Sequence, residues 1–506
     1  MTARPIAFAV GAAYIECMGT PRLDSSQREF LASLASVVFG NPYTRERVAL
    51  IRRLAPDAPP NLASDREALA RVVAPKLKSL LAAGWAAFAD EDRRLLEPAF
   101  LYVTYHRFVP QIDAHIERQA TRQGEPMRVD FGDDLMADLV RAGFAEERAA
   151  RFFSLFFQLR RAFYFIGESL AGESPPMERF RRALWNNIFT HDMRAYEASL
   201  WSRMEDFSTL ILGETGTGKG AAAAAIGRSE FIPYLPPERR FAANFAQTFI
   251  SINLSQFPEM LIESELFGHR KGAFTGAIDH HQGVFERCSA HGALFLDEIG
   301  EAAVPVQIKL LQVLKESTFT TVGGHEKKRF SGRVIAATNR PLADLRRAGR
   351  FRDDFYYRLC SDVIQVPTLR ERIEASPAEL AELVALLVQR TIHAQSLELV
   401  AYVLDVLARD LPRGYAWPGN VRELEQAVRR VLLTGSYKPD VEAAPSLDAE
   451  ERLLARVREG NLSAEELLSG YSALLYRRLG SYAAVAERTG LDPRTSRKYV
   501  LSAKSG

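Results

Sequence analysis

The chain has 506 residues, of which 47% are hydrophobic and 25% are charged, and its formal net charge is +2. This length exceeds what one hydrophobic core supports, so we expect about three domains. The composition excludes a disordered or collagen-like chain. The small net charge excludes a chain that is basic throughout, so any nucleic-acid site must be local.

The three cysteines Cys17, Cys288 and Cys360 are far apart, and none belongs to a CxxC pair. This spacing is typical of a reduced, cytoplasmic protein and argues against a disulfide or a cysteine metal site. The most apolar stretch, residues 152–166, is interrupted by two arginines. It therefore indicates a buried helix, and we expect no membrane-spanning segment.

Residues 1–172 are predicted to form a mostly helical regulatory domain. Apolar residues recur every three or four positions in three stretches, Asp65–Ala74, Leu77–Ala87 and Phe131–Phe157. Ser64, with Glu67 three positions later, predicts a capping box at the start of the first helix. No catalytic constellation is present, so this domain is expected to bind an unknown effector or partner protein, or to hold the rest of the chain apart.

A proline- and glycine-rich break at 172–176 precedes a change of pattern. Short runs that are apolar on both faces then alternate with helical stretches, namely Thr209–Leu212, Phe249–Ile252, Ala293–Leu296 and Arg333–Ala337. Such runs predict buried parallel strands, and hence an α/β domain over residues 173–376. A helical subdomain is expected over 377–437, and a linker with further helices over 438–506.

A glycine-rich loop follows the first of these strands and precedes an alanine-rich helix. It consists of Gly213, Glu214, Thr215, Gly216, Thr217, Gly218 and Lys219. In this context the backbone N–H groups close around phosphate oxygens and the lysine contacts the β- and γ-phosphates, which predicts an ATP site. Gly220 stands where many such loops place the Ser or Thr that contacts Mg²⁺.

Two acids end the strand at Ala293–Leu296. Asp297 is suited to coordinate Mg²⁺, and Glu298 is suited to orient and deprotonate the attacking water. Acids at a strand end also cap helices, but their position downstream of a phosphate loop favours catalysis. Thr338 and Asn339 end another strand and are candidates to bond the γ-phosphate.

Three arginines are candidates to neutralise charge in the transition state: Arg352, Arg358 and Arg422. Taken alone, each is more often a surface salt-bridge residue.

Six motifs occur in an order that closely resembles the sigma-54-dependent activators, the bacterial enhancer-binding branch of the AAA+ ATPases. They are GETGTGK at 213–219, ESELFGHRKGAFTGA at 263–277, LFLDEIG at 294–300, AATNR at 336–340, FRDDFYYRL at 351–359 and WPGNVRELE at 417–425. The resemblance covers roughly residues 174–437. It implies a homo-oligomer that proceeds from dimers to a hexameric ring, with sigma-54 RNA polymerase and enhancer DNA as partners.

The resemblance also implies roles for single residues. The GAFTGA loop, Gly272, Ala273, Phe274, Thr275, Gly276 and Ala277, would contact sigma-54. Asn253 would hold the catalytic Glu298 inactive, Arg352 and Arg358 would reach the neighbouring subunit's ATP, and Arg422 would sense nucleotide. A second mobile loop is expected near Thr320–Lys328.

The chain departs from the family pattern at three places. Gly220 replaces the usual Glu, which puts nucleotide affinity in doubt. The segments 180–205 and 228–247 look longer than usual, and we expect them to decorate the surface of the ring.

The C-terminal tail resembles the helix-turn-helix domain of these activators. From Tyr471 to the end it has seven Arg or Lys against two acids. Helices are expected at Ser481–Thr489 and Pro493–Leu501, joined by a turn at residues 490–492. Side chains expected to face DNA are Arg494, Thr495, Arg497 and Lys498. A basic hairpin used for dimerisation is the alternative.

The sequence thus predicts a transcriptional activator that binds ATP and Mg²⁺. Two other readings stay open at this point. One is a DNA-binding regulator with an inactive ATPase, which Gly220 keeps in play. The other is an AAA+ machine that remodels a different protein client.

Overall fold

The computed structural model describes residues 22–56, 62–122, 124–168, 170–439, 453–454, 456–457, 460 and 462–502. The chain divides into two compact units. One comprises the residues up to Leu404 together with Gly414–Leu432, and the other comprises Asp405–Arg413 and the residues from Leu433 onward.

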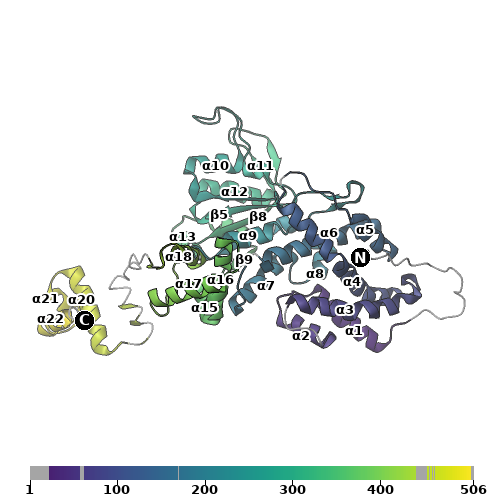
Figure 1. Ribbon diagram of the computed structural model, residues 1–506. Coiled ribbons are helices and arrows are strands. Elements are labelled where there is room, and N and C mark those ends of the chain that lie inside the picture. Colours follow the sequence, from purple (N-terminus) through teal and green to yellow (C-terminus); the bar gives the residue numbers. More distant parts are fainter. Residues whose placement is uncertain are drawn as a thin grey trace. The chain divides into compact units, whose positions relative to one another are not determined.

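Helices make up the N-terminal part of the first unit, coloured purple to blue in Figure 1. Their bounds are α1 (Ser25–Phe39), α2 (Arg45–Leu54), α3 (Leu62–Leu80), α4 (Asp90–Ala120), α5 (Gly132–Arg141) and α6 (Glu146–Phe163). The α1–α3 helices and the start of α4 bury a core of their own. The second half of α4, with α5 and α6, belongs to a larger core that continues into the α/β domain.

A five-stranded parallel sheet lies at the centre of the α/β domain, in the order β4-β5-β8-β1-β9. The strands are β1 (Thr209–Leu212), β4 (Phe249–Asn253), β5 (Ala293–Asp297), β8 (Arg333–Thr338) and β9 (Asp362–Gln365). Four of the five coincide closely with the apolar runs in the sequence. The edge strand β9 was not predicted, because Asp362 and Gln365 at its ends leave an apolar run of only Val363 and Ile364.

Helices cover both faces of the sheet, as the continuous apolar strands require. They are α7 (Pro175–Phe189), α8 (Met193–Ala195), α9 (Lys219–Gly227), α10 (Glu259–Phe267), α11 (Val284–Arg287), α12 (Val304–Glu316), α13 (Leu342–Arg347), α14 (Asp353–Leu359) and α15 (Leu369–Ala375). Alternate residues of each strand enter two separate cores, so Ile335 faces α9 whereas Val334 faces α12.

A helical lid follows, with α16 (Ala378–Ile392), α17 (Leu397–Asp410) and α18 (Asn420–Thr434). The second unit contains α20 (Ala464–Leu479), α21 (Tyr482–Thr489) and α22 (Pro493–Ser502), which pack around Leu475, Val485 and Val500. Gly490 adopts a left-handed φ of 69° between α21 and α22, as the expected turn requires. These two helices lie where the sequence places them, and the expected parallel-sheet α/β domain with its helical subdomain is confirmed.

The N-terminal helices differ from expectation in three places. Ser64 is not an N-cap, because α3 already begins at Leu62, where Leu62 and Ala63 are strong helix formers. The helix expected over Leu77–Ala87 ends at Leu80 and gives way to 3-10 turns around Gly84, which has a φ of 86°. The stretch 131–157 is split between α5 and α6 at Gly143, whose φ is 87°.

The expectation that residues 180–205 and 228–247 decorate the surface is wrong. Phe231, Ile232, Tyr234, Phe241 and Phe245 are all at most 9% exposed. The hairpin of β2 (Tyr234–Leu235) and β3 (Arg240–Phe241) packs on α6, where the Phe241 and Phe157 rings stack with centroids 3.8 Å apart. In the earlier segment, Trp185 and Tyr196 are equally buried. Both segments therefore join the N-terminal helices to the ATPase domain.

Candidate functional site

The glycine-rich loop leads from the end of β1 into α9, with its backbone N–H groups at the positive end of that helix. Gly216 and Gly218 have φ values of 80° and 103°. A Cβ at Gly216 would lie 2.1 Å from the carbonyl oxygen of Gly419 in the lid, so no larger residue fits there. The loop is thus shaped by glycine both for its own turn and for the approach of the lid.

Lys219 is 8% exposed and lies across the loop. Its Nζ donates to the carbonyl oxygens of Gly213, at 2.9 Å, and Glu214, at 3.1 Å. Burial lowers the pKa of Lys219, while the charges of Glu298 and Asp297 raise it. The ammonium and the two acids therefore lie within electrostatic reach of one another, as a phosphate site requires.

The two acids end β5 at the carboxyl edge of the sheet. Asp297 Oδ1 accepts a hydrogen bond of 3.0 Å from the backbone N–H of Glu298, whose φ of 54° is left-handed. Asn253 pairs with Asp297 across β4 and β5, which brings it to the same edge. Its side-chain oxygen accepts from Ser255 N and Oγ, and no hydrogen bond joins Asn253 to Glu298 in the part of the chain that the structure describes.

The end of β8 completes this edge. Asn339 Nδ2 donates to Thr215 Oγ1 over 2.8 Å, which ties β8 to the phosphate loop. Thr338 is fully buried, and its Oγ1 accepts from the backbone N–H of Arg340. Of the predicted pair, Asn339 therefore faces the loop directly.

The three candidate arginines lie in different surroundings. Arg422, on α18, approaches Gly216, to whose carbonyl its backbone N–H donates at 3.4 Å. Arg352 pairs with Asp354 at 2.8 Å, and Arg358 Nε donates to the carbonyl oxygen of Leu314. Within the described residues, neither Arg352 nor Arg358 bonds to the phosphate loop of its own chain.

A lid residue that the sequence reasoning did not single out holds the lid to the phosphate loop. Asn420 is fully buried and has a φ of 54°. Its Nδ2 donates to Glu214 Oε2 and to the Thr215 carbonyl oxygen, and its Oδ1 accepts from the Leu369 N–H. The signal was present, since Asn420 lies inside the WPGNVRELE motif beside Arg422.

The 272–277 loop projects between α10 and α11 and is closed by its own backbone hydrogen bonds. Gly272 N donates to the Ala277 carbonyl oxygen at 2.8 Å, and Ala277 N donates to that of Phe274 at 3.0 Å. Phe274 packs edge-on against His269 with ring centroids 4.9 Å apart, while Thr275 at the tip is exposed.

The hairpin of β6 (Thr318–Thr320) and β7 (Lys327–Arg329) occupies the place of the expected second loop. Its turn packs against the base of the 272–277 loop. A Cβ added to Gly323 would lie 2.8 Å from the Ala273 Cβ, and Arg270 N donates to the Val322 carbonyl oxygen. The two loops therefore form one surface feature.

In the second unit, Arg494, Arg497 and Lys498 on α22 are exposed, and Thr495 is half-buried. Asp492 caps α22 by accepting from Arg494 N at 2.8 Å. The exposed cations lie on one short helix, which is the arrangement that a DNA-facing helix needs.

These features agree with comparisons to known proteins. Residues 191–365 match the sigma-54 interaction domain family. The chain is 38% identical to DNA-binding transcriptional regulator NtrC of Azospirillum brasilense, over 64% of this chain and 59% of that protein. It is 41% identical to a Nif-specific regulatory protein of Azotobacter vinelandii, over 51% of this chain and 47% of that one.

Among solved structures, NtrX from Brucella abortus in complex with ATP matches at 22% identity with a TM-score of 0.39, covering 73% of this chain and 80% of that chain. This value is too low to add to the assignment. The chain spans between 47% and 59% of the length of the two regulators named above.

The phosphate loop, the acidic strand end and the helical lid define an AAA+ P-loop ATPase domain. Within that class, residues 191–365 carry a sigma-54 interaction domain, and the chain is similar to the two regulators named above. No helix in the described ranges is long and apolar enough to cross a membrane.

Proposed function

We propose that this chain hydrolyses ATP in an oligomeric ring and uses the energy to remodel sigma-54 RNA polymerase at promoters whose enhancers it binds. One observation carries the proposal. An exposed Thr275 tips a closed GAFTGA loop on the same domain whose sheet edge brings together Lys219, Asp297 and Glu298.

The chemistry follows from the sheet edge. Lys219 and the N-terminus of α9 would bind the phosphates, and Glu298 would accept the proton of the attacking water. Asp297 fits Mg²⁺, because it is a carboxylate beside the lysine and only one of its oxygens accepts a hydrogen bond within the described residues. Bound Mg²⁺ would neutralise phosphate charge. Gly220 supplies no hydroxyl, although a Cβ there would meet only Phe295 at 4.0 Å.

A short path connects this edge to the sigma-54 loop. Asn253 ends β4 beside Asp297, and the chain then passes through one 3-10 turn into α10. α10 ends at Phe267, and Gly268 leads into the 272–277 loop. A change in the phosphate at the sheet edge would therefore reach the loop through a single helix.

Ring assembly would complete the ATP site. Arg352 and Arg358 make no bond to the phosphate loop of their own chain in the described residues, and Arg352 is 40% exposed. Both are suited to reach the neighbouring subunit's ATP, where an arginine supplied in trans accelerates hydrolysis by roughly 10³–10⁵-fold. Dimers would bind enhancer DNA through α22, and the whole process would take place in the cytoplasm.

The test is a native-gel binding assay with purified sigma-54. The full chain is loaded with Mg-ADP and aluminium fluoride, which mimics ATP near its transition state. We expect a complex that requires the nucleotide, is lost in Thr275→Ala and is kept in Ile278→Ala, a control at the residue just after the loop, which is 74% exposed.

Two other results would redirect the proposal. ATP hydrolysis without a complex would indicate a different protein client. Absence of both the complex and ATP hydrolysis in the full chain would indicate a DNA-binding regulator with an inactive ATPase.

A further inference from the structure

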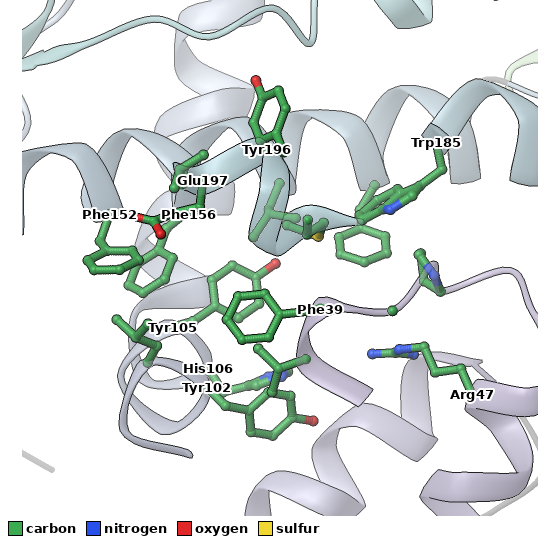
Figure 2. A pocket seen from close by; sticks show the side chains of 18 residues that line it. Phe39, Arg47, Tyr102, Tyr105, His106, Phe152, Phe156, Trp185, Tyr196 and Glu197 are labelled. Atoms are coloured by element: carbon green, nitrogen blue, oxygen red, sulfur yellow. The ribbon is translucent and has the colours of Figure 1, made fainter. Parts of the chain in front are cut away.

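A cavity of about 90 Å³ lies among the N-terminal helices, where they meet α7 and the turn η4 (Tyr196–Leu200). Figure 2 shows its walls. The walls come from the end of α1, the start of α2 and the residues between them, and from α4, α6, α7 and the α8–η4 segment. Protein interiors hold few voids of this size, because unfilled space forfeits packing contacts.

Most of the lining is aromatic or aliphatic. Phe39, Phe152, Phe156 and Phe163 contribute rings, and Leu101 and Leu159 contribute aliphatic surface. Apolar cavities of roughly 150 Å³ bind single aromatic rings. At about 90 Å³ this cavity is smaller than those, so a single ring is the largest group that its apolar lining could hold.

The polar lining is unequal on the two sides of the cavity. In Figure 2, Arg47 and Trp185 lie on one side and Glu197 on the other. Trp185 is 2% exposed, and within the described residues its indole Nε1 has no hydrogen-bond partner. Glu197 already accepts from Arg151 at 3.1 Å. The side with Arg47 and Trp185 therefore offers donors and positive charge, which favour an acidic group on the ligand.

We propose that this cavity is an effector site for a single-ring aromatic carboxylate, with its ring among the phenylalanines and its carboxylate facing Arg47 and Trp185. The carboxylate would accept from the Trp185 N–H, and Arg47 would supply the compensating charge. A buried N–H without a partner is costly, so an acceptor from the ligand at this position would stabilise the complex.

The cavity is placed to influence the ATPase. Tyr196 lines it, and the Tyr196 hydroxyl bonds Gln158, whose Nε2 also donates to the carbonyl oxygen of Ser229, just after α9. Arg161, which lies on α6 with Gln158, donates to the carbonyl oxygens of Arg228 and Glu230. Because α9 begins at Lys219 of the phosphate loop, a ligand that moves α6 or η4 would change the ATP site.

The test is calorimetric titration of the full chain with benzoate, and with benzyl alcohol as a neutral molecule of similar size. We expect saturable benzoate binding that is about ten-fold tighter than that of benzyl alcohol, as a charge-assisted contact implies. Trp185→Phe keeps a ring but removes the N–H, and it should weaken benzoate binding about ten-fold. Trp201→Phe, outside the cavity, is the matched control and should leave binding unchanged.

Leu101→Phe fills the cavity and should abolish binding, with retained folding checked by circular dichroism. Binding that persists in this variant, or no benzoate binding by the wild-type chain, would overturn the site. Equal affinity for benzyl alcohol would overturn the carboxylate assignment.

The link between this cavity and ATP hydrolysis rests on the proposed function, and a separate hydrolysis assay tests it. Benzoate should shift the rate of ATP hydrolysis several-fold in the wild-type chain and not in Leu101→Phe. Binding without such a shift would overturn the coupling and leave the site in place. Loss of hydrolysis with and without benzoate would count against the proposed function instead.

Discussion

The carboxyl edge of the sheet and the contact between α6 and residues 231–245 are built in opposite ways. The edge gathers exposed or half-buried polar side chains, such as Glu298 and Asn339, from the ends of strands that are far apart in sequence. The α6 contact gathers buried aromatic rings, such as Phe157 and Phe241, and the buried ion pair of Arg333 with Glu230 lies beside it. The first region is arranged for chemistry, and the second holds two parts of the chain together.

The second region joins the N-terminal helices directly to the α/β domain. These helices share a continuous core with the ATPase domain, and that core reaches Ile335 and Ala337 on the central strand β8. A signal received among these helices therefore need not pass through a flexible linker. Substitutions of the catalytic side chains at the edge should change catalysis more than folding, whereas substitutions of buried groups at or beside the contact should mainly lower the stability of the fold.

The largest effect is expected at the edge. Glu298→Gln removes the base that accepts the proton of the attacking water, so hydrolysis should fall by roughly 10²–10⁴-fold. Nucleotide binding, followed with a fluorescent ATP analogue, should stay close to that of the wild-type chain. Glu301→Gln, which alters the acid that pairs with Arg340, is the control. Unchanged hydrolysis in Glu298→Gln would refute the assignment of the base.

The next largest effect is expected at the buried ion pair beside the contact. Arg333 is 2% exposed and pairs with Glu230 at 3.0 Å. Arg333→Met leaves that carboxylate buried without its partner, which should lower the free energy of unfolding by about 3–5 kcal/mol. Urea unfolding measures this, with the exposed Arg329→Met as the control.

The double variant of Arg333→Met with Glu230→Leu should recover most of the stability lost by the single one, because the unpaired buried charge is then gone. A loss below about 1 kcal/mol in the single variant would show that the network contributes little to the contact.

A smaller, pH-dependent effect on the free energy of unfolding is expected at His115, whose ring lies beside that of Phe241. Burial, together with the nearby charge of Arg118 and opposed by that of Asp130, lowers the pKa of His115 to about 4. As the pH falls from about 7.5 to about 5.5, the imidazole of His115 takes up a proton in the unfolded chain but stays neutral in the folded chain. The free energy of unfolding should therefore fall by about 1 kcal/mol as the pH drops. His115→Leu should remove that part of the pH dependence, and an unchanged profile would contradict it.

The smallest effect, on thermal stability, is expected at Gly220, close to the carboxyl edge of the sheet. Gly220 lies in the first turn of α9 without a left-handed φ, and a Cβ there would meet nothing closer than Phe295 at 4.0 Å. Gly220→Ala should therefore stabilise the chain by about 0.5–1 kcal/mol in thermal unfolding. A destabilised variant would indicate that this position is constrained by contacts that the single chain does not show.

The sequence predicted the edge well and the contact poorly, for physical reasons. Strands buried on both faces read as continuous apolar runs, and Asp297 and Glu298 follow one of them at once. The burial of Phe231 or Phe241 depends instead on partners on α4 and α6, which lie more than fifty residues away and share no spacing rule with them. Asn420 could have been found from its motif, whereas the cavity beside Trp185 leaves no trace in any local pattern.

The most direct test of the central claim is permanganate footprinting of a sigma-54-dependent promoter with sigma-54 RNA polymerase and the full chain. A high concentration of the chain replaces the tethering that an enhancer would provide. We predict melted promoter DNA with ATP, and none with a non-hydrolysable analogue, with Glu298→Gln or with Thr275→Ala. Melting that persists without hydrolysis, or no melting while the wild-type chain hydrolyses ATP, would contradict the account.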